Sequence, residues 1–302
     1  MLLLKRSRAK LFQHFTISKF LNFIIPLRYF LHLTYDGTNY CGWQVQANAP
    51  SVQETINKAL EKLLGQHIGS MGCGRTDTGV HAKDFYMHFE CSEIPNLDNF
   101  LFRLNCVLPR DISVFKIIPL HDKAHARFDA TERTYEYFIH FQKNPYIHLY
   151  SFYYGFYQVD WEKILDATEY LKTVSDFTSL CLPSEDFKTN ICQISEARWD
   201  VLPSHDRVLK RYEDTDKYEI LATRPVKKVN AHESLRFVFT SNRFLRGMVR
   251  KTVGTLLHLG KGKISVDEFK QTIADKKEFR VHYLAPPMGL FLSKIKYPYI
   301  TD

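Results

Sequence analysis

The sequence lacks the cysteine and histidine spacings that mark metal sites and disulfide frameworks. Its six cysteines include no Cys-x-x-Cys pair, and none lies at zinc-finger spacing from a histidine. This usage is typical of free thiols in a reducing compartment, so we expect a cytoplasmic protein with no structural metal. The sequence also has no H-E-x-x-H, G-x-S-x-G or Walker motif, which argues against the enzyme classes that these motifs mark.

A long hydrophobic run is also missing. The segment "FLNFIIPL" (20–27) follows a basic region, but it is too short to span a bilayer, and no small-residue cleavage site follows it. We therefore expect no membrane association. Residues 1–27 are interpreted as an N-terminal extension outside the fold, which includes the case of a misplaced start codon. A functional basic arm and a targeting peptide remain as alternatives.

Most of the chain has little excess charge. The net charge is +8, from 41 basic and 33 acidic residues. Residues 1–35 contribute six basic residues and no acid, which leaves 35 basic against 33 acidic residues in the rest. Overall charge is therefore weak evidence for a polyanionic partner, and a nucleic-acid surface would have to come from local asymmetry.

The first half of the chain contains six expected elements in the order β-α-β-β-α-β. The expected strands are 28–38, 68–73, 82–91 and 112–120, and the expected helices are 51–65 and 96–109. Ser51 and Glu54 form a capping box at the start of the first helix. The order is that of a ferredoxin-like α+β fold, in which two helices cover one face of an antiparallel sheet.

The second half has similar ingredients. The expected strands are 134–141, 191–201, 234–240 and 290–297, the expected helices are 159–174, 243–259 and 265–274, and 203–232 is a loop or hairpin. At 302 residues the chain is long enough for two domains. We predict an N-terminal α+β domain (28–123) and a C-terminal α+β domain (124–302), two ferredoxin-like halves with antiparallel sheets joined around a central cleft.

One short stretch surrounds an acid with glycines and basic groups. It reads "GCGRTDTGVHA" (72–82), with Arg75 two residues before Asp77. Glycines permit unusual backbone angles and close approach of a ligand, and a nearby arginine favours an ionised carboxylate. An ionised aspartate can act as nucleophile or general base. Taken alone, the stretch is also compatible with a turn in which Asp77 caps a backbone group.

Three further stretches strengthen the functional interpretation of Asp77. In "FLRGMVRKTVGTLLHLGKGK" (244–263), Arg246 and Arg250 fall on one face of the expected helix. Such a basic face is usually solvated, but this one could reach a phosphate or the Asp77 carboxylate. In "ARFDATERTYEYF" (126–138), arginines alternate with aromatics, a pattern that suits base stacking or, alternatively, an aromatic core face. "YDGTNYCGWQVQ" (35–46) is a glycine-rich turn followed by Trp43, which is also explained as a core residue.

Together these stretches, with "SVQETI" and "APPMGLFL", resemble the TruA-type tRNA pseudouridine synthases. The resemblance runs from about residue 29 to residue 297, and the motifs around Asp77 and Arg250 are highly specific. Departures are small: Thr78 stands where alanine is usual, and Cys73 and Cys41 replace residues that are more common in the family. The segment 1–27 has no counterpart in the family core.

The resemblance implies an isomerase that converts uridine to pseudouridine at positions 38, 39 and 40 of the tRNA anticodon stem-loop, as a homodimer without cofactor or metal. Asp77 matches the catalytic aspartate, which either attacks C1′ or assists proton loss at C2′. Arg250 matches its arginine partner, and Tyr135 matches the tyrosine that packs on uracil and serves as a late base. Arg75 matches the residue that helps to extrude the nucleotide. We also expect Arg127, Arg246, Lys261 and Lys263 to bind tRNA.

Two other function classes are considered. One is a catalytically inactive RNA-binding protein on the same fold, which the presence of all the matched residues disfavours. The other is a thiol enzyme that uses Cys73 with His81, although no third orienting group is evident.

Overall fold

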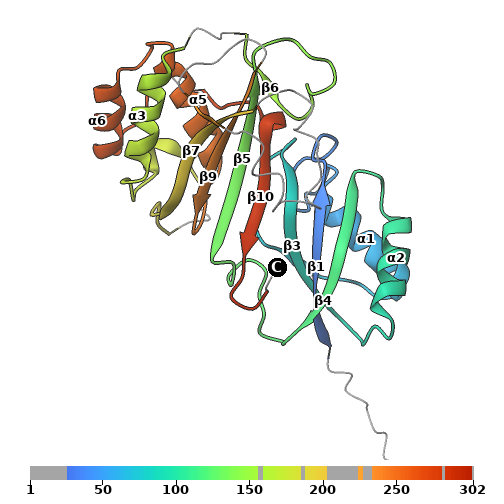
Figure 1. Ribbon diagram of the computed structural model, residues 1–302. Helices are drawn as coiled ribbons and strands as arrows, with labels where there is room; N and C mark the ends of the chain where they lie inside the picture. Colours follow the sequence, from blue (N-terminus) through green and yellow to red (C-terminus); the bar gives the residue numbers. More distant parts are fainter. Residues whose placement is uncertain are drawn as a thin grey trace, which may run out of the picture.

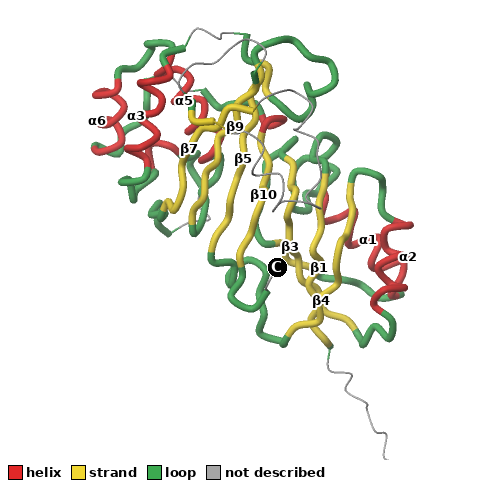
Figure 2. The backbone as a smooth tube through the Cα atoms, in the orientation of Figure 1, coloured by secondary structure: helices red, strands yellow, loops and turns green. Residues whose placement is uncertain are grey.

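The computed structural model describes residues 26–155, 159–184, 188–202, 224–226, 233–280 and 283–300. These residues form one open, mixed sheet of ten strands with helices at its two ends, an α+β architecture (Figures 1 and 2). Most of the expected N-terminal extension and of the expected hairpin at 203–232 lies outside the described residues.

The first half follows the predicted element order. It consists of β1 (Leu27–Tyr35), α1 (Val52–Leu64), β2 (Ser70–Gly72), β3 (His81–Cys91), α2 (Leu97–Val107) and β4 (Ile112–Leu120). The strands are antiparallel neighbours in the order β4-β1-β3-β2. The hydroxyl of Ser51 accepts a hydrogen bond from the backbone N–H of Glu54, and Gly65 ends α1 at a φ of 70°, as the capping pattern predicts.

The second half repeats this strand order. Its elements are β5 (Glu132–His140), β6 (Phe152–Tyr153), α3 (Trp161–Leu171), β7 (Ile194–Leu202), β8 (Arg224–Pro225), β9 (Ser234–Ser241), α5 (Met248–Gly260), α6 (Val266–Ala274) and β10 (Leu290–Lys296). The main strands run β10-β5-β9-β7, again as antiparallel neighbours. The two-residue strands β6 and β8 were not predicted because they are too short to show a periodic pattern.

The two halves meet in the middle of the sheet. There β10, which is red in Figure 1, lies between β3 and β5. It pairs with β5 along most of its length, but it pairs with β3 in parallel through only two residue pairs, Phe291 with His81 and Leu292 with Ala82. The sheet is therefore continuous, although its central seam is short.

The predicted helix at 243–259 is wrong at its start. Helix α5 begins only at Met248, because Gly247 adopts a left-handed conformation with a φ of 64°. Arg246 therefore lies in the preceding loop and does not share a helical face with Arg250. The helix is also central to the fold: most of its residues are buried, and the buried ammonium of Lys251 donates a hydrogen bond to the carbonyl of Cys181 (2.9 Å). The expectation that this helix presents a solvated basic face is therefore wrong.

None of the helices within the described residues is long and apolar enough to cross a membrane.

Candidate active site

The Asp77 loop connects β2 to β3 and packs closely against the turn around Gly42. A Cβ atom on Gly42, whose φ is +91°, would lie 2.2 Å from the carbonyl oxygen of Thr76. The Tyr35 and Thr76 hydroxyls are 2.8 Å apart, and Trp43 is buried beneath the loop. Trp43 is therefore a core residue, as one of the two interpretations predicted. The glycine-rich turn at 35–46 packs against the loop that carries Asp77 and holds it in place.

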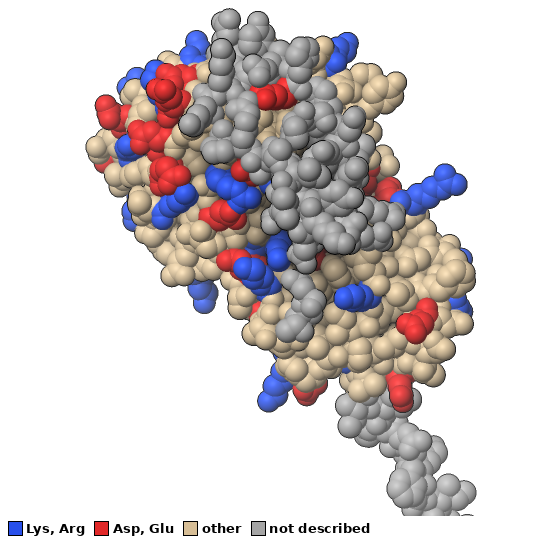
Figure 3. Space-filling view, in the orientation of Figure 1, with Lys and Arg blue, Asp and Glu red and all other residues tan. Residues whose placement is uncertain are grey.

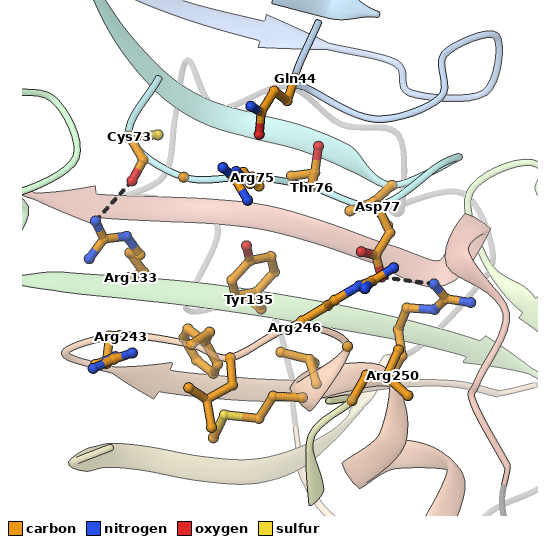
Figure 4. Close-up of a pocket in the computed structure, with 18 of the residues that line it drawn as sticks. Gln44, Cys73, Arg75, Thr76, Asp77, Arg133, Tyr135, Arg243, Arg246 and Arg250 are labelled. Atoms are coloured by element: carbon orange, nitrogen blue, oxygen red, sulfur yellow. Dashed lines mark hydrogen bonds and ion pairs between the residues drawn. The ribbon is translucent and has the colours of Figure 1, made fainter. Parts of the chain in front are cut away.

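Asp77 forms an ion pair with Arg250. The Nη1 atom of Arg250 lies 2.9 Å from Oδ2 of Asp77, and its Nε donates a hydrogen bond to the carbonyl of Ala285 (2.7 Å). The Arg250 side chain is 13% exposed and that of Asp77 is 34% exposed, so the carboxylate faces solvent while its partner is fixed. Within the described part of the chain, Oδ1 of Asp77 accepts no hydrogen bond. One oxygen is thus held, and the other is available to a substrate (Figure 4).

Tyr135 lies opposite the loop, on β5 (Figure 4). Its ring is 8% exposed and meets Phe244 edge to face at 4.9 Å. Burial raises the pKa of the Tyr135 hydroxyl above its usual range, and the nearby Cys73 and Asp77 add to this. The hydroxyl therefore stays protonated, so the ring presents a neutral aromatic surface beside the carboxylate.

These groups line one cleft with a volume of about 1170 Å³. Asp77 is the single acid among the described residues that line it. Seven basic side chains line it as well, namely Arg75, Arg127, Arg133, Lys188, Arg243, Arg246 and Arg250. On the part of the molecular face visible in Figure 3, basic and acidic side chains are interspersed. The local asymmetry that a polyanion requires is thus found in the cleft.

The structure separates the predicted tRNA-binding residues into two places. Arg75, Arg127 and Arg246 line the cleft with Asp77. Lys261 and Lys263 follow the end of α5, whose last residue, Gly260, lies about 15 Å along the helix axis from Arg250 at a rise of about 1.5 Å per residue. Neither lysine lines the cleft. The ammonium of Lys261 lies 4.6 Å from the centre of the Tyr154 ring.

Arg133 has a role that the sequence analysis did not identify. Its guanidinium donates hydrogen bonds to four backbone carbonyls, those of Cys73 (2.9 Å), Arg127 (2.7 Å), Ala130 (3.2 Å) and Asn242 (3.1 Å). These carbonyls belong to three loops that border the cleft. The only available signal was its position two residues before Tyr135, which places both side chains on one face of a strand.

The thiol-enzyme alternative does not fit this geometry. Cys73 is fully buried, and burial raises the pKa of its thiol to about 12, which opposes a thiolate nucleophile. The ring nitrogens of His81 face Asp36, the backbone N–H of Gly37 and the carbonyl of Leu149. All six cysteines are free thiols. Within the described ranges, no group of three or more histidine, cysteine or acidic residues is arranged to hold a metal ion.

Comparisons with known proteins give a consistent result. Residues 167–298 match a family model described as tRNA pseudouridine synthase. The chain is 40% identical over 272 residues to tRNA pseudouridine synthase A of Bacteroides fragilis, which covers 90% of this chain and 96% of that protein. It is 37% identical to the protein of that name from Azobacteroides pseudotrichonymphae (90% and 97% covered) and 33% identical to that from Clostridium acetobutylicum (88% and 98%).

Proposed function

The chain belongs to the tRNA pseudouridine synthase family, and we infer that it isomerises uridine to pseudouridine in tRNA. In this reaction the bond from C1′ to N1 of uracil breaks, the base turns, and C5 bonds to C1′. The proton on C5 is lost and N1 gains one, so the overall change is an isomerisation. The observation that carries the assignment is the Asp77–Arg250 ion pair, in a cleft where the other charged side chains among the described residues are all basic.

We propose that Asp77 starts the reaction. Both chemical routes, attack on C1′ and assistance of proton loss at C2′, require an ionised carboxylate with an accessible oxygen. Arg250 pairs with Oδ2 of Asp77, and this hydrogen bond orients the carboxylate toward the cleft. A deuterium at C2′ distinguishes the routes, because only the second breaks the C2′–H bond.

Tyr135 is proposed to pack against the extruded uracil. Its buried, neutral ring supports this packing role better than the role of a phenolate base late in the reaction. Arg75 is exposed at the cleft and is proposed to fill the space that the extruded nucleotide leaves. Extrusion costs a few kcal/mol of unstacking, which such contacts offset.

The tRNA is proposed to bind along the basic cleft through Arg127 and Arg246, and beyond the end of α5 through Lys261 and Lys263. Positions 38, 39 and 40 of the anticodon stem-loop are the proposed targets. Recognition through phosphates and shape fits this set of arginines, and it predicts binding that weakens steeply with salt.

We further propose that the two halves, 28–123 and 124–302, are each ferredoxin-like domains. The strand orders β4-β1-β3-β2 and β10-β5-β9-β7 support this, because each equals the fourth, first, third and second main strand of its half. A homodimer in the cytoplasm is also proposed, and sedimentation equilibrium tests the dimer. The inactive RNA-binding alternative is not supported, since the relatives are named as synthases and the acid and its arginine are paired.

The central test is Asp77→Asn. The amide keeps the size of the side chain but removes the negative charge, so we expect tRNA to bind while pseudouridine formation falls to background. The assay is chemical labelling of pseudouridine in tRNA incubated with pure protein, with binding measured by filter retention. Asp98→Asn, an exposed position on α2, is the matched control. Substantial turnover by Asp77→Asn would remove Asp77 from the chemistry.

A further inference from the structure

An exposed phenylalanine stands at the rim of the cleft. Phe128 belongs to the loop between β4 and β5, and its side chain is 74% exposed although it lies beside the site. Its ring stacks on His125 (4.3 Å between ring centres), and the Arg127 guanidinium lies 5.8 Å from its centre. An aromatic ring this exposed contributes little to the core. Single exposed apolar residues are common, and what distinguishes Phe128 is that it lines the same cleft as Asp77.

The loop that carries Phe128 is held from within. Nδ1 of His125 accepts hydrogen bonds from the backbone N–H groups of Arg127 (3.1 Å) and Phe128 (3.2 Å). The backbone N–H of Ala126 donates to Nδ1 of His88 (3.0 Å). Three consecutive backbone amides are therefore fixed by histidine side chains.

The same loop is also tied to the rest of the fold. Oδ2 of Asp129 accepts hydrogen bonds from the His125 backbone N–H (2.7 Å) and from the Tyr299 hydroxyl (2.8 Å). Arg133 binds the carbonyls of Arg127 and Ala130. With so many contacts the loop presents the Phe128 ring in one place, which reduces the entropy that a ligand contact would cost.

We propose that Phe128 is a stacking platform for an unpaired base of the tRNA that neighbours the target uridine, with Arg127 on the adjacent phosphate. This inference rests on the proposed function. The cleft, at about 1170 Å³, exceeds the 300 to 1,000 Å³ typical of sites for one small molecule, so it has room for more than one nucleotide. Tyr135 serves the target base, and Phe128 offers a second aromatic surface toward solvent. Aromatic rings interleaved with cations are the usual surface for single-stranded bases.

The test measures binding in the Asp77→Asn background, where no reaction occurs. The probe is an anticodon stem-loop RNA that carries 2-aminopurine at one loop position at a time. Phe128→Ala should raise Kd about 5- to 150-fold, the range expected for one lost base stack. It should also abolish the fluorescence quenching at one position. Phe102→Ala is the matched control, since Phe102 is 69% exposed on α2 and does not line the cleft.

Two conservative variants separate stacking from general hydrophobic contact. Phe128→Trp should bind as tightly as the parent, whereas Phe128→Leu should behave like the alanine variant. If Phe128→Ala binds and quenches like the parent, or if the leucine variant binds normally, the platform is refuted. The proposed function fails separately, by absence of pseudouridine with the unaltered protein. The inference is also refuted if Phe128→Ala weakens binding to a protein partner but leaves the affinity for RNA unchanged.

Discussion

Replacing Arg133 by lysine tests whether this arginine assembles the site or binds RNA. Its Nη2 atom donates to the carbonyls of Cys73 (2.9 Å) and Arg127 (2.7 Å), and its Nη1 atom donates to those of Ala130 and Asn242. Lysine keeps the charge, but one ammonium cannot reproduce the planar fork that reaches all four oxygens. The loops that carry these carbonyls would lose their common anchor.

The size of the effect follows from the two Nη2 bonds, which are partly buried. A hydrogen bond from a charged donor contributes about 1.5–3 kcal/mol, so the loss of both should lower the free energy of unfolding of Arg133→Lys by about 3–6 kcal/mol. Cys73 opens the loop that bears Asp77, and a displacement of about 1 Å in a reacting group can cost about 100-fold in rate. The single-turnover rate at saturating enzyme should therefore fall as well.

Urea unfolding and single-turnover pseudouridine formation are the two measurements, with Arg103→Lys on the exposed face of α2 as the control. The reasoning is refuted if Arg133→Lys unfolds and reacts like the parent. If it instead binds tRNA more weakly, with a salt slope smaller by about 0.7–0.9, Arg133 contacts a phosphate and its carbonyl contacts are incidental.

Two other predictions follow from single contacts. Arg250→Ala should leave tRNA binding nearly unchanged but lower the single-turnover rate, because the Asp77 carboxylate loses the partner that orients it; a normal rate at saturation would contradict the pairing. His88 is buried, and this burial, together with the charges of His125 and Arg28, lowers the pKa of its imidazole to about 4. Its Nδ1 atom accepts a hydrogen bond from the Ala126 N–H, so this nitrogen must stay unprotonated in the folded protein. The unfolded chain therefore binds the proton more readily, and the free energy of unfolding should fall by about 2 kcal/mol between about pH 7 and pH 5. Urea titrations of the parent and of His88→Gln at both pH values measure this, and equal pH dependence in the two would exclude His88.

The sequence predicted the long elements well because their signals are local. Ser51 and Gly65 bracket α1, and periodic apolar residues mark the main strands. It failed at the start of α5, where Gly247 takes a left-handed conformation that no periodicity reveals. The side chain of Arg246 consequently reaches the cleft from a loop and not from a helical face.

The site was predictable only in part, and for a physical reason. The local pattern around Asp77 indicated a carboxylate surrounded by glycines and basic groups. Its contact with Arg250 joins residues 173 positions apart, so the sequence offered it only as one of several partners for a basic face, and the family resemblance was needed to select it. Arg133 could not be assigned from sequence, because a guanidinium binds a carbonyl oxygen and a phosphate oxygen by the same hydrogen bonds. Where the acceptors lie is a property of the folded loops.

The position of β10 determines when the sheet can be completed during synthesis. This strand, residues Leu290–Lys296, fills the centre of the sheet, although it comes last among the described strands. During synthesis the first half can pair its own strands, but the seam between β3 and β5 stays open until β10 has left the ribosome. A chain interrupted before residue 290 would carry both Asp77 and Arg250 yet expose the edges of two half-sheets, a surface prone to aggregation. The full sheet therefore forms only after residues Leu290–Lys296 have been synthesised.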